Sequence, residues 1–118
     1  MGDNSPVSII PKELRERFEQ EKLLPAIAQD SQNKDVLMMA WMNLESMEKS
    51  LSSGQATFWS RSRDELWVKG ATSGNFLEIE KIYFDCDADT ILLTVRPSGP
   101  ACHTGARTCF NREIEIKR

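Results

Sequence analysis

The first half of the chain alternates between apolar runs and short polar breaks, a pattern that predicts a helix followed by two strands. A helix is expected to begin at Pro11, because Leu14 and Phe18 then lie one turn apart on one helical face. Residues 24–29 and 35–42 are predicted as strands separated by a polar turn. The run 35–42 is almost entirely apolar, which is typical of a strand buried on both faces.

The clearest helix is predicted over residues 43–53. Asn43 is a favourable N-cap, Glu45 in the first turn suits the helix dipole, and Gly54 is placed to end the helix. Three apolar side chains fall on one face of this segment, namely Leu44, Met47 and Leu51. We expect it to be the main helix of the fold.

The second half of the chain reads as short strands joined by loops rich in Gly, Asp and hydroxyl residues. Strands are predicted over residues 56–60, 65–69, 76–84 and 90–95, and a last one over 112–117, where the sequence REIEIK alternates. The expected fold is therefore α+β: a small β-rich domain with a mostly antiparallel sheet.

A length of 118 residues fits one domain. Residues 1–10 are expected to be irregular and mobile; residues 1–22 would form an N-terminal extension with its short helix, ahead of a single domain over 23–118. The composition, 40% hydrophobic and 28% charged, is that of a globular chain. We expect no membrane association and no secretion, because the chain has neither an apolar run of spanning length nor an apolar signal segment.

The net charge and the number of cysteines exclude two further classes of protein. The net charge of −3 and a pI of about 5.2 argue against nucleic acid as a partner, since such binders usually carry a basic surplus. Three cysteines are an odd number, so a disulfide framework is not indicated, and reduced thiols in the cytoplasm fit better.

The cysteines and the single histidine form the first candidate site. Cys102 and Cys109 flank His103, and Cys86 lies upstream. Thiolates are good ligands for zinc, and three of them leave a fourth position open for water. The C-x₆-C spacing is not a zinc knuckle, however, so small buried cysteines are an equally good interpretation. His103 would be a general base, a fourth ligand or simply structural. The signature of zinc nucleobase deaminases is missing.

The second candidate site is acidic. Asp85, Asp87 and Asp89 would share one side of an extended backbone, where their repulsion would be relieved by a hard cation such as Mg²⁺. The segment is not an EF-hand loop, because Thr90 and Arg96 occupy its required Gly and Glu positions. An ordinary acidic turn is the alternative.

The third candidate site is a phosphate cradle built from cations, hydroxyls and Gly-rich loops. It is not a Walker A loop, and a basic turn beside an ordinary loop is the alternative. Either Trp59 or Trp67 is placed to stack on a base. The candidate substrate-binding residues are Trp59, Ser60, Arg61, Arg63, Lys69, Thr72, Ser73 and Asn75.

Six ordered blocks together resemble one family. The blocks are LPAIAQD, VLMMAWMN, ATFWSRSR, ELWVKGATSGN, DCDAD and GPACHTGARTCF, and they extend from Leu24 to Phe110. They are similar to the motifs of phosphoribosyl-AMP cyclohydrolase. Some members of this family are fused to a phosphoribosyl-ATP pyrophosphohydrolase domain. The length of the present chain leads us to expect the monofunctional form.

The resemblance implies a reaction and an assembly. Water would add at C6 of the adenine ring of phosphoribosyl-AMP, and the N1–C6 bond would open to give ProFAR, the third step of histidine biosynthesis. The resemblance also implies an intertwined homodimer with its active sites at the subunit interface. Zinc, one ion per subunit, would be held by Cys86 of one chain and Cys102 and Cys109 of the other. Mg²⁺ would bind Asp85, Asp87 and Asp89.

The resemblance leaves His103 as the candidate for accepting or relaying the proton of the attacking water. Two other classes stay open: a zinc-stabilised binding module without activity, and a different metal-dependent purine or nucleotide hydrolase. The missing fourth thiolate disfavours the first, and the ordered blocks disfavour the second.

Overall fold

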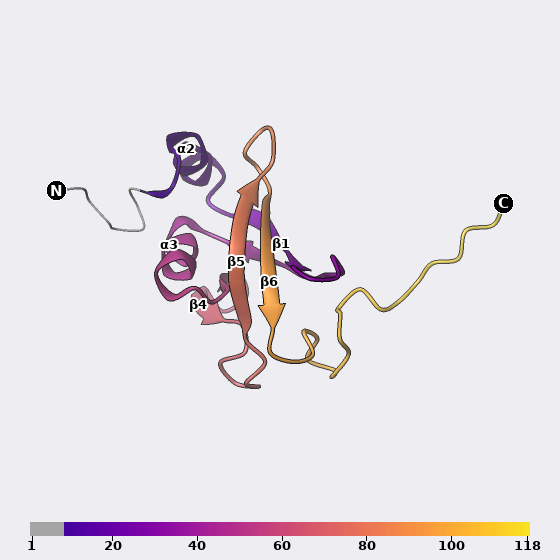
Figure 1. Cartoon of the computed structure of the whole chain (residues 1–118). Coiled ribbons are helices and arrows are strands. Elements are labelled where there is room, and N and C mark those ends of the chain that lie inside the picture. The colour runs from indigo at the N-terminus through magenta and orange to yellow at the C-terminus, as the bar shows by residue number, and fades with distance from the viewer. Residues whose placement is uncertain (1–8) are drawn as a thin grey trace.

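The structure is a computed structural model that describes residues 9–118, and Figure 1 shows how its helices and strands are arranged. The small α+β class predicted from the sequence is confirmed. The helices are α2 (Lys12–Glu21) and α3 (Leu44–Ser53). The strands are β1 (Leu24–Asp30), β2 (Val36–Met42), β3 (Thr57–Ser60), β4 (Glu65–Val68), β5 (Leu77–Phe84) and β6 (Ile91–Pro97).

Four of the strands form one sheet in the order β2-β1-β6-β5, and β3 pairs with β4 in a second, two-stranded sheet. The hairpins β1–β2, β3–β4 and β5–β6 are antiparallel, as the pattern predicts. The pairing of β1 with β6 is parallel, with Ala26 opposite Ile91. This long-range pairing brings the acidic turn after β5 and the start of β1 to the same end of the sheet.

Helix α3 begins and ends as its sequence predicts. The side chain of Asn43 accepts a hydrogen bond of 2.8 Å from the backbone of Ser46, whose hydroxyl accepts one from the backbone of Asn43. These two bonds satisfy helix N–H groups that have no partner inside the helix. At the other end Gly54 adopts a φ of +75°, the left-handed conformation that glycine tolerates best.

Helix α2 corrects the expectation of a single main helix, because it is as long as α3, at ten residues. Leu14 and Phe18 are each 3% exposed, and both belong to the same core cluster as the sheet residues. Ile10 is equally buried, so it is not part of an irregular mobile end. The rest of that expectation, for residues 1–8, lies outside the described residues.

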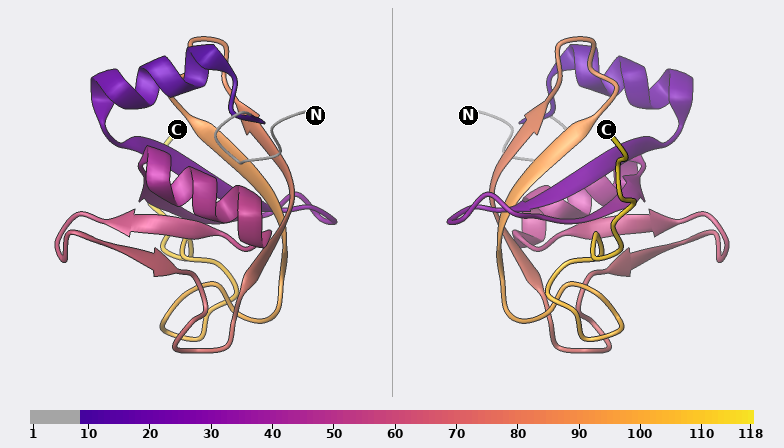
Figure 2. Two further views of the ribbon diagram at one scale, coloured as in Figure 1. Left: turned by 90° about the vertical axis from the view of Figure 1, so that its left-hand side faces the viewer. Right: turned by 90° about the vertical axis from the view of Figure 1, so that its right-hand side faces the viewer.

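The core lies between the helices and the inner face of the four-stranded sheet. The left view of Figure 2 places α3 in front of this inner face, while the right view shows no helix in front of β1 and β6 on the opposite face. Every second residue of β1, from Leu24 to Asp30, is buried. Across residues 9–118, neither helix has the length and apolar character needed to cross a bilayer.

Two strand predictions are wrong in part. Strand β2 was expected to be buried on both faces, but Val36 and Met39 are each 43% exposed, because nothing in the described chain covers the outer face of the sheet. Residues 112–117 were expected to close a sheet, but they form no strand. Ile114 is 90% exposed, so the alternating segment has no surface of its own chain to cover.

Candidate active site

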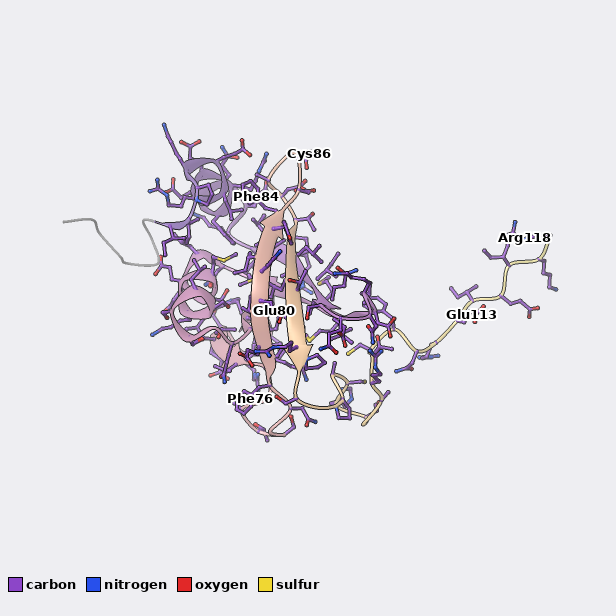
Figure 3. All side chains as sticks on the ribbon, in the orientation of Figure 1. Phe76, Glu80, Phe84, Cys86, Glu113 and Arg118 are labelled. Carbon is purple, nitrogen blue, oxygen red and sulfur yellow. The ribbon has the colours of Figure 1, made fainter. Side chains whose placement is uncertain are left out.

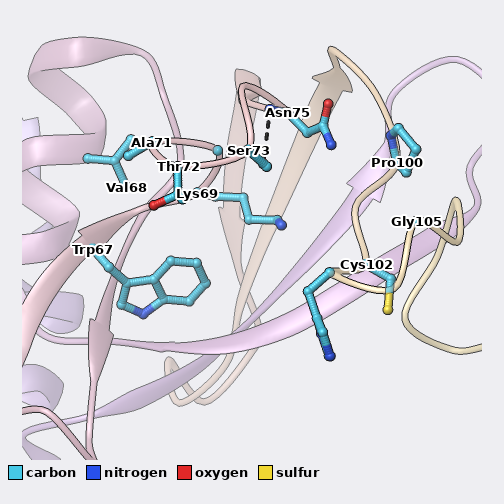
Figure 4. A pocket seen from close by; sticks show the side chains of 12 residues that line it. Trp67, Val68, Lys69, Ala71, Thr72, Ser73, Asn75, Pro100, Cys102 and Gly105 are labelled. Atoms are coloured by element: carbon cyan, nitrogen blue, oxygen red, sulfur yellow. Dashed lines mark hydrogen bonds between the residues drawn. The ribbon is translucent and has the colours of Figure 1, made fainter.

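A cavity of about 350 Å³ opens where the end of β4 meets two loops, residues 70–75 and 98–109 (Figure 4). Lys69 reaches from the end of β4 into the space between Trp67 and the loop that carries Cys102. The cavity is thus lined by residues of two segments that are distant in sequence: the end of β4 with the loop after it, and the loop that carries Cys102. Its lining includes Trp67, Lys69, Thr72, Ser73, Asn75, Cys102 and His103.

The 70–75 loop is held in shape by its own backbone. Gly74 donates a hydrogen bond of 2.7 Å to the carbonyl of Gly70, and Asn75 donates one of 3.2 Å to the hydroxyl of Ser73. Gly70 has a φ of +95°, and a Cβ at this position would lie 2.5 Å from backbone atoms of Asn75 and Phe76. The close approach therefore requires glycine, and it sets the position of the polar side chains that line the cavity.

We expect Gly70→Ala to lower the free energy of unfolding by about 2–3 kcal/mol, because the new Cβ combines backbone strain with an overlap on backbone atoms. Urea unfolding followed by circular dichroism measures this loss. Gly74→Ala is the matched control: its φ is +82°, but no atom lies within 4 Å of the added Cβ. A loss at Gly70 no larger than that at Gly74 would contradict the close-approach argument.

The cysteine loop is a compact turn that brings two thiols together. Cys102 donates a backbone hydrogen bond of 3.1 Å to Ala106, and Gly105 donates one of 3.0 Å back to Cys102. The chain then turns toward β2, where the backbone N–H of Cys109 donates to the carbonyl of Leu37 at 2.7 Å. Cys102 and Cys109 thereby face each other although six residues separate them.

Arg107 ties this loop to the β1–β2 turn, a role that the sequence analysis did not assign. Its guanidinium pairs with the carboxylate of Asp35 and, at 3.2 Å, with that of Asp30. Asp30 is 7% exposed, and its other oxygen accepts a backbone hydrogen bond from Gln32. Because the Asp30 carboxylate is buried and has fixed hydrogen-bond partners, it holds the Arg107 guanidinium in one position. In the sequence, the one feature that sets Arg107 apart is its position between Cys102 and Cys109.

The two thiols differ in their protonation chemistry. The hydroxyl of Thr104 donates to Cys102 Sγ at 3.0 Å, and this bond is the main reason that the pKa of Cys102 lies below its usual value. A hydrogen bond from Cys109 and the positive charge of Lys69 lower that pKa further. Desolvation, followed by the bond to Cys102, raises the pKa of Cys109. Cys102 is therefore the readier thiolate and the better ligand for a cation.

The acidic turn lies at the far end of the β5–β6 hairpin from this cavity, and Figure 3 labels Cys86 at its tip. The carboxylate oxygens of Asp85, Asp87 and Asp89 lie within 4.8 Å of one another. They come together through a tight turn, in which Ala88 has a φ of +58°, and not along an extended backbone as the alternation argument assumed. Hard oxygen ligands at this separation fit a divalent cation such as Mg²⁺.

Asp85 organises the turn by accepting hydrogen bonds from the backbone of Asp89 at 2.9 Å and of Thr90 at 3.1 Å. Desolvation raises the pKa of Asp85, but these bonds outweigh it and hold the net pKa below its usual value. The pKa of Asp89 is raised, first by its hydrogen bond with Asp85 and then by desolvation and the neighbouring charges. Arg17 of α2 donates to the carbonyl of Asp87 at 2.8 Å, a link that the sequence analysis also missed.

The described chain does not bring the third cysteine to the other two. Within residues 9–118, the acidic triad is the one group of three or more His, Cys, Asp or Glu side chains close enough to share a metal ion. Cys86 sits on the acidic turn between β5 and β6, whereas Cys102 and Cys109 follow the other end of β6, at the opposite end of this antiparallel hairpin. Thiolates are suitable zinc ligands, but two of them are too few, because protein zinc sites have at least three protein ligands.

The predicted substrate residues separate into two groups. Lys69, Thr72, Ser73 and Asn75 line the cavity together with His103, as described above. The other four lie on β3 and the turn after it, outside this lining. The Arg61 guanidinium stacks over the Trp41 ring at 4.6 Å, and Arg63 pairs with Glu65 at 3.4 Å. The contribution of Trp59, Ser60, Arg61 and Arg63 to binding therefore stays a prediction.

The comparisons with known proteins define the chain as a hydrolase. Residues 38–111 match a family model described as phosphoribosyl-AMP cyclohydrolase, and this segment includes the cavity, the acidic turn and all three cysteines. The chain belongs to the phosphoribosyl-AMP cyclohydrolase family. The sequence resemblance to this family is confirmed.

Curated relatives align along most of the chain. A phosphoribosyl-AMP cyclohydrolase of Trichormus variabilis is 55% identical over 101 residues, which cover 85% of this chain and 87% of the relative. One from Micrococcus luteus is 58% identical over 98 residues, 82% of this chain and 78% of the relative. A histidine biosynthesis bifunctional protein of Prochlorococcus marinus is 55% identical over 100 residues, 84% of this chain but 44% of that longer protein.

Proposed function

We propose that this chain catalyses the hydrolytic opening of the adenine ring of phosphoribosyl-AMP in histidine biosynthesis, in the cytoplasm. Water adds at C6, the N1–C6 bond breaks, and ProFAR is formed. The observation that carries the proposal is the cavity that gathers Lys69, Cys102 and His103 inside the segment matched by the family model. The three free thiols suit a compartment that keeps cysteines reduced.

The protein supplies binding, orientation and proton transfer at this cavity. Lys69 and the hydroxyls of Thr72 and Ser73 bind a phosphate of the substrate, since an ammonium and two short hydroxyls on one loop match its oxygens. The Trp67 ring, which forms the opposite wall, stacks on the base. His103 is exposed at the rim, where its imidazole accepts the proton of the attacking water.

Zinc would be held by Cys102 and Cys109 of one copy together with Cys86 of the partner subunit in a homodimer. The two facing thiols and the lowered pKa of Cys102 support this ligand set, and the third ligand has to come from elsewhere. A zinc ion at such a site lowers the pKa of water toward about 7 and so provides the nucleophile at neutral pH. The acidic triad holds Mg²⁺, for which its three converging carboxylates are suited.

The direct test is turnover of phosphoribosyl-AMP by zinc-loaded protein with Mg²⁺, followed by the ultraviolet change on ring opening. We expect turnover that a chelator abolishes and that added zinc restores, because the nucleophile depends on the metal. AMP is the matched control substrate, since it has the same base without the second phosphoribosyl group.

Each result that contradicts the proposal would favour a different alternative. Folded, zinc-containing protein without turnover would contradict the proposed reaction and favour a zinc-stabilised binding module. Turnover of AMP at a comparable rate would indicate a different purine hydrolase. Turnover that survives chelation, with zinc shown to be absent, would contradict the proposed metal dependence.

A further inference from the structure

The loop over residues 98–109, which carries Cys102 and Cys109, contains no helix or strand, so its shape depends on its hydrogen bonds and ion pairs. Two thiols that share one metal ion have to lie at a fixed separation. Where the loop that carries them is not held in advance, metal binding has to order it, and the conformational entropy lost in that ordering lowers the affinity. The contacts that hold this loop therefore affect how tightly the proposed site binds zinc.

Arg107 is the residue at which the two halves of the loop are joined. Its backbone carbonyl accepts a hydrogen bond of 3.1 Å from the N–H of Ala101, which closes the turn that contains Cys102. The hydroxyl of the next residue, Thr108, donates to the carbonyl of Val36 on β2 at 2.7 Å. The main chain at Arg107 is thus fixed both to the turn of the first thiol and to the strand beside the second.

The Arg107 side chain is fixed on a turn that is closed by its own hydrogen bonds. The guanidinium pairs with the carboxylates of Asp35 and Asp30. The two oxygens of Asp30 have separate partners, because Oδ2 accepts from the guanidinium at 3.2 Å while Oδ1 accepts from the backbone N–H of Gln32 at 2.9 Å. The backbone N–H of Asp30 donates to the carbonyl of Asp35 at 2.8 Å, so both acceptors belong to one closed turn.

This contact differs from an ordinary surface ion pair, which contributes little because water competes for both charges. The Asp30 carboxylate is buried, and it lies 77 residues from Arg107 in the sequence, so the pair fixes a tertiary arrangement. Arg107 is not part of the cavity lining, whereas Cys102 is. Any effect of Arg107 on the site therefore has to pass through the loop.

We infer that Arg107 is a positioning residue for the zinc site of the proposed function, on which this inference rests. Anchored on Asp30 and Asp35, it holds the loop in the shape that makes the two thiols face each other, so that the metal binds without first ordering them. The planar guanidinium suits this task, because its fork of N–H donors binds two carboxylates at once in a defined geometry.

The zinc affinity of the full chain, measured by competition with a chromophoric chelator, tests the inference without reference to turnover. Arg107→Gln is expected to raise the zinc dissociation constant about 10–100-fold, the usual effect of losing a residue that supports a metal ligand. Arg107→Lys keeps the charge without the fork, so its dissociation constant is expected to lie between those of Arg107→Gln and the wild type.

The thiolate charge-transfer absorption of bound Co²⁺ distinguishes a weakened site from a changed one. At saturating Co²⁺ the Arg107→Gln protein is expected to show the wild-type absorption, because its thiolate ligands are the same and only their positioning is lost. An absorption that is missing even at saturation would show that the ligand set itself is gone, and this result would overturn a positioning role.

Asp30→Asn is the complementary variant. Its side-chain oxygen can still accept from Gln32, while its amide nitrogen replaces the oxygen that accepts from Arg107. We expect Asp30→Asn to weaken zinc binding, and the double variant with Arg107→Gln to bind zinc no more weakly than Arg107→Gln alone, since both changes break the same link. Losses that simply add would overturn the Asp30 anchor.

Arg96→Gln is the matched control. Arg96 of β6 also pairs with two carboxylates, Glu78 at 2.7 Å and Glu80 at 3.3 Å, and its side chain is 53% exposed, against 48% for Arg107. It is expected to leave the zinc dissociation constant unchanged, and circular dichroism checks that every variant is folded. An equal loss of affinity in Arg96→Gln, or wild-type affinity in Arg107→Gln, would overturn the inference.

The inference and the proposed function fail in different ways. A wild-type protein that binds zinc, and binds it more weakly after Arg107→Gln, but does not turn over phosphoribosyl-AMP would count against the proposed reaction alone. Turnover with a zinc affinity that does not depend on Arg107 would overturn the inference alone. A folded wild-type protein that binds no zinc would contradict both.

Discussion

Replacing Cys102 with serine is expected to remove most of the bound zinc and to lower turnover of phosphoribosyl-AMP by at least about 100-fold. Loss of a residue that merely supports a metal ligand costs about 10–100-fold in affinity or activity, and loss of a ligand is expected to cost more. Cys102 is 9% exposed and has the lowered pKa of a ready thiolate, so a hydroxyl at this position is a poor replacement. Zinc content by plasma emission spectroscopy and the turnover assay measure the two effects.

Thr104→Val is the matched control, because it removes the hydroxyl that donates to Cys102 Sγ but keeps the thiol. We expect a smaller loss for Thr104→Val than for Cys102→Ser, in the range of a supporting residue, about 10–100-fold. Cys102→Ser with full zinc and full turnover would remove this residue from the ligand set.

Mixing two inactive variants then tests whether the zinc site is shared. In a dimer of one Cys86→Ser chain and one Cys102→Ser chain, one of the two sites contains only native ligands. Random exchange of subunits in a two-fold dimer would restore about a quarter of the wild-type activity. No recovery, in a mixture shown to contain the mixed dimer, would contradict a site built from both chains.

Replacing His103 with alanine is expected to lower the turnover rate by about 10²–10⁴-fold while the zinc content stays unchanged, which is the usual contribution of a general acid or base. His103 is exposed and lines the same cavity as Cys102 and Lys69, where its imidazole is free to meet a bound substrate. Turnover and zinc content are measured on the same preparation, so that a lost ligand is told apart from a lost base.

Addition of free imidazole to the His103→Ala protein tests for proton transfer, because it would not restore the turnover rate if His103 were purely structural. A small base that enters the space left by the side chain is expected to restore part of the rate. Rate and zinc lost together would identify His103 as a ligand or a support of the metal site. A near-normal rate would leave it without a part in proton transfer.

Local features of this protein were readable from the sequence because short-range physics decides them. The Asn43 cap, the Gly54 stop and the apolar face of α3 are set by neighbours within one or two turns. The loop at residues 70–75 and the acidic turn were also predicted from their local residues, although a tight turn, and not an extended backbone, brings the three carboxylates together. The family resemblance rests on the same local blocks, and the match over residues 38–111 confirms it.

The tertiary structure decided what depends on distant partners. It placed Lys69 and His103, far apart in sequence, at one cavity, and it set Cys86 away from the other two cysteines, which spacing alone did not reveal. It also separated the 112–117 segment from every strand of its own chain, although its alternation is a good strand pattern. Alternation shows that a segment has an apolar side, but whether a strand lies beside it to pair with is decided by distant parts of the chain.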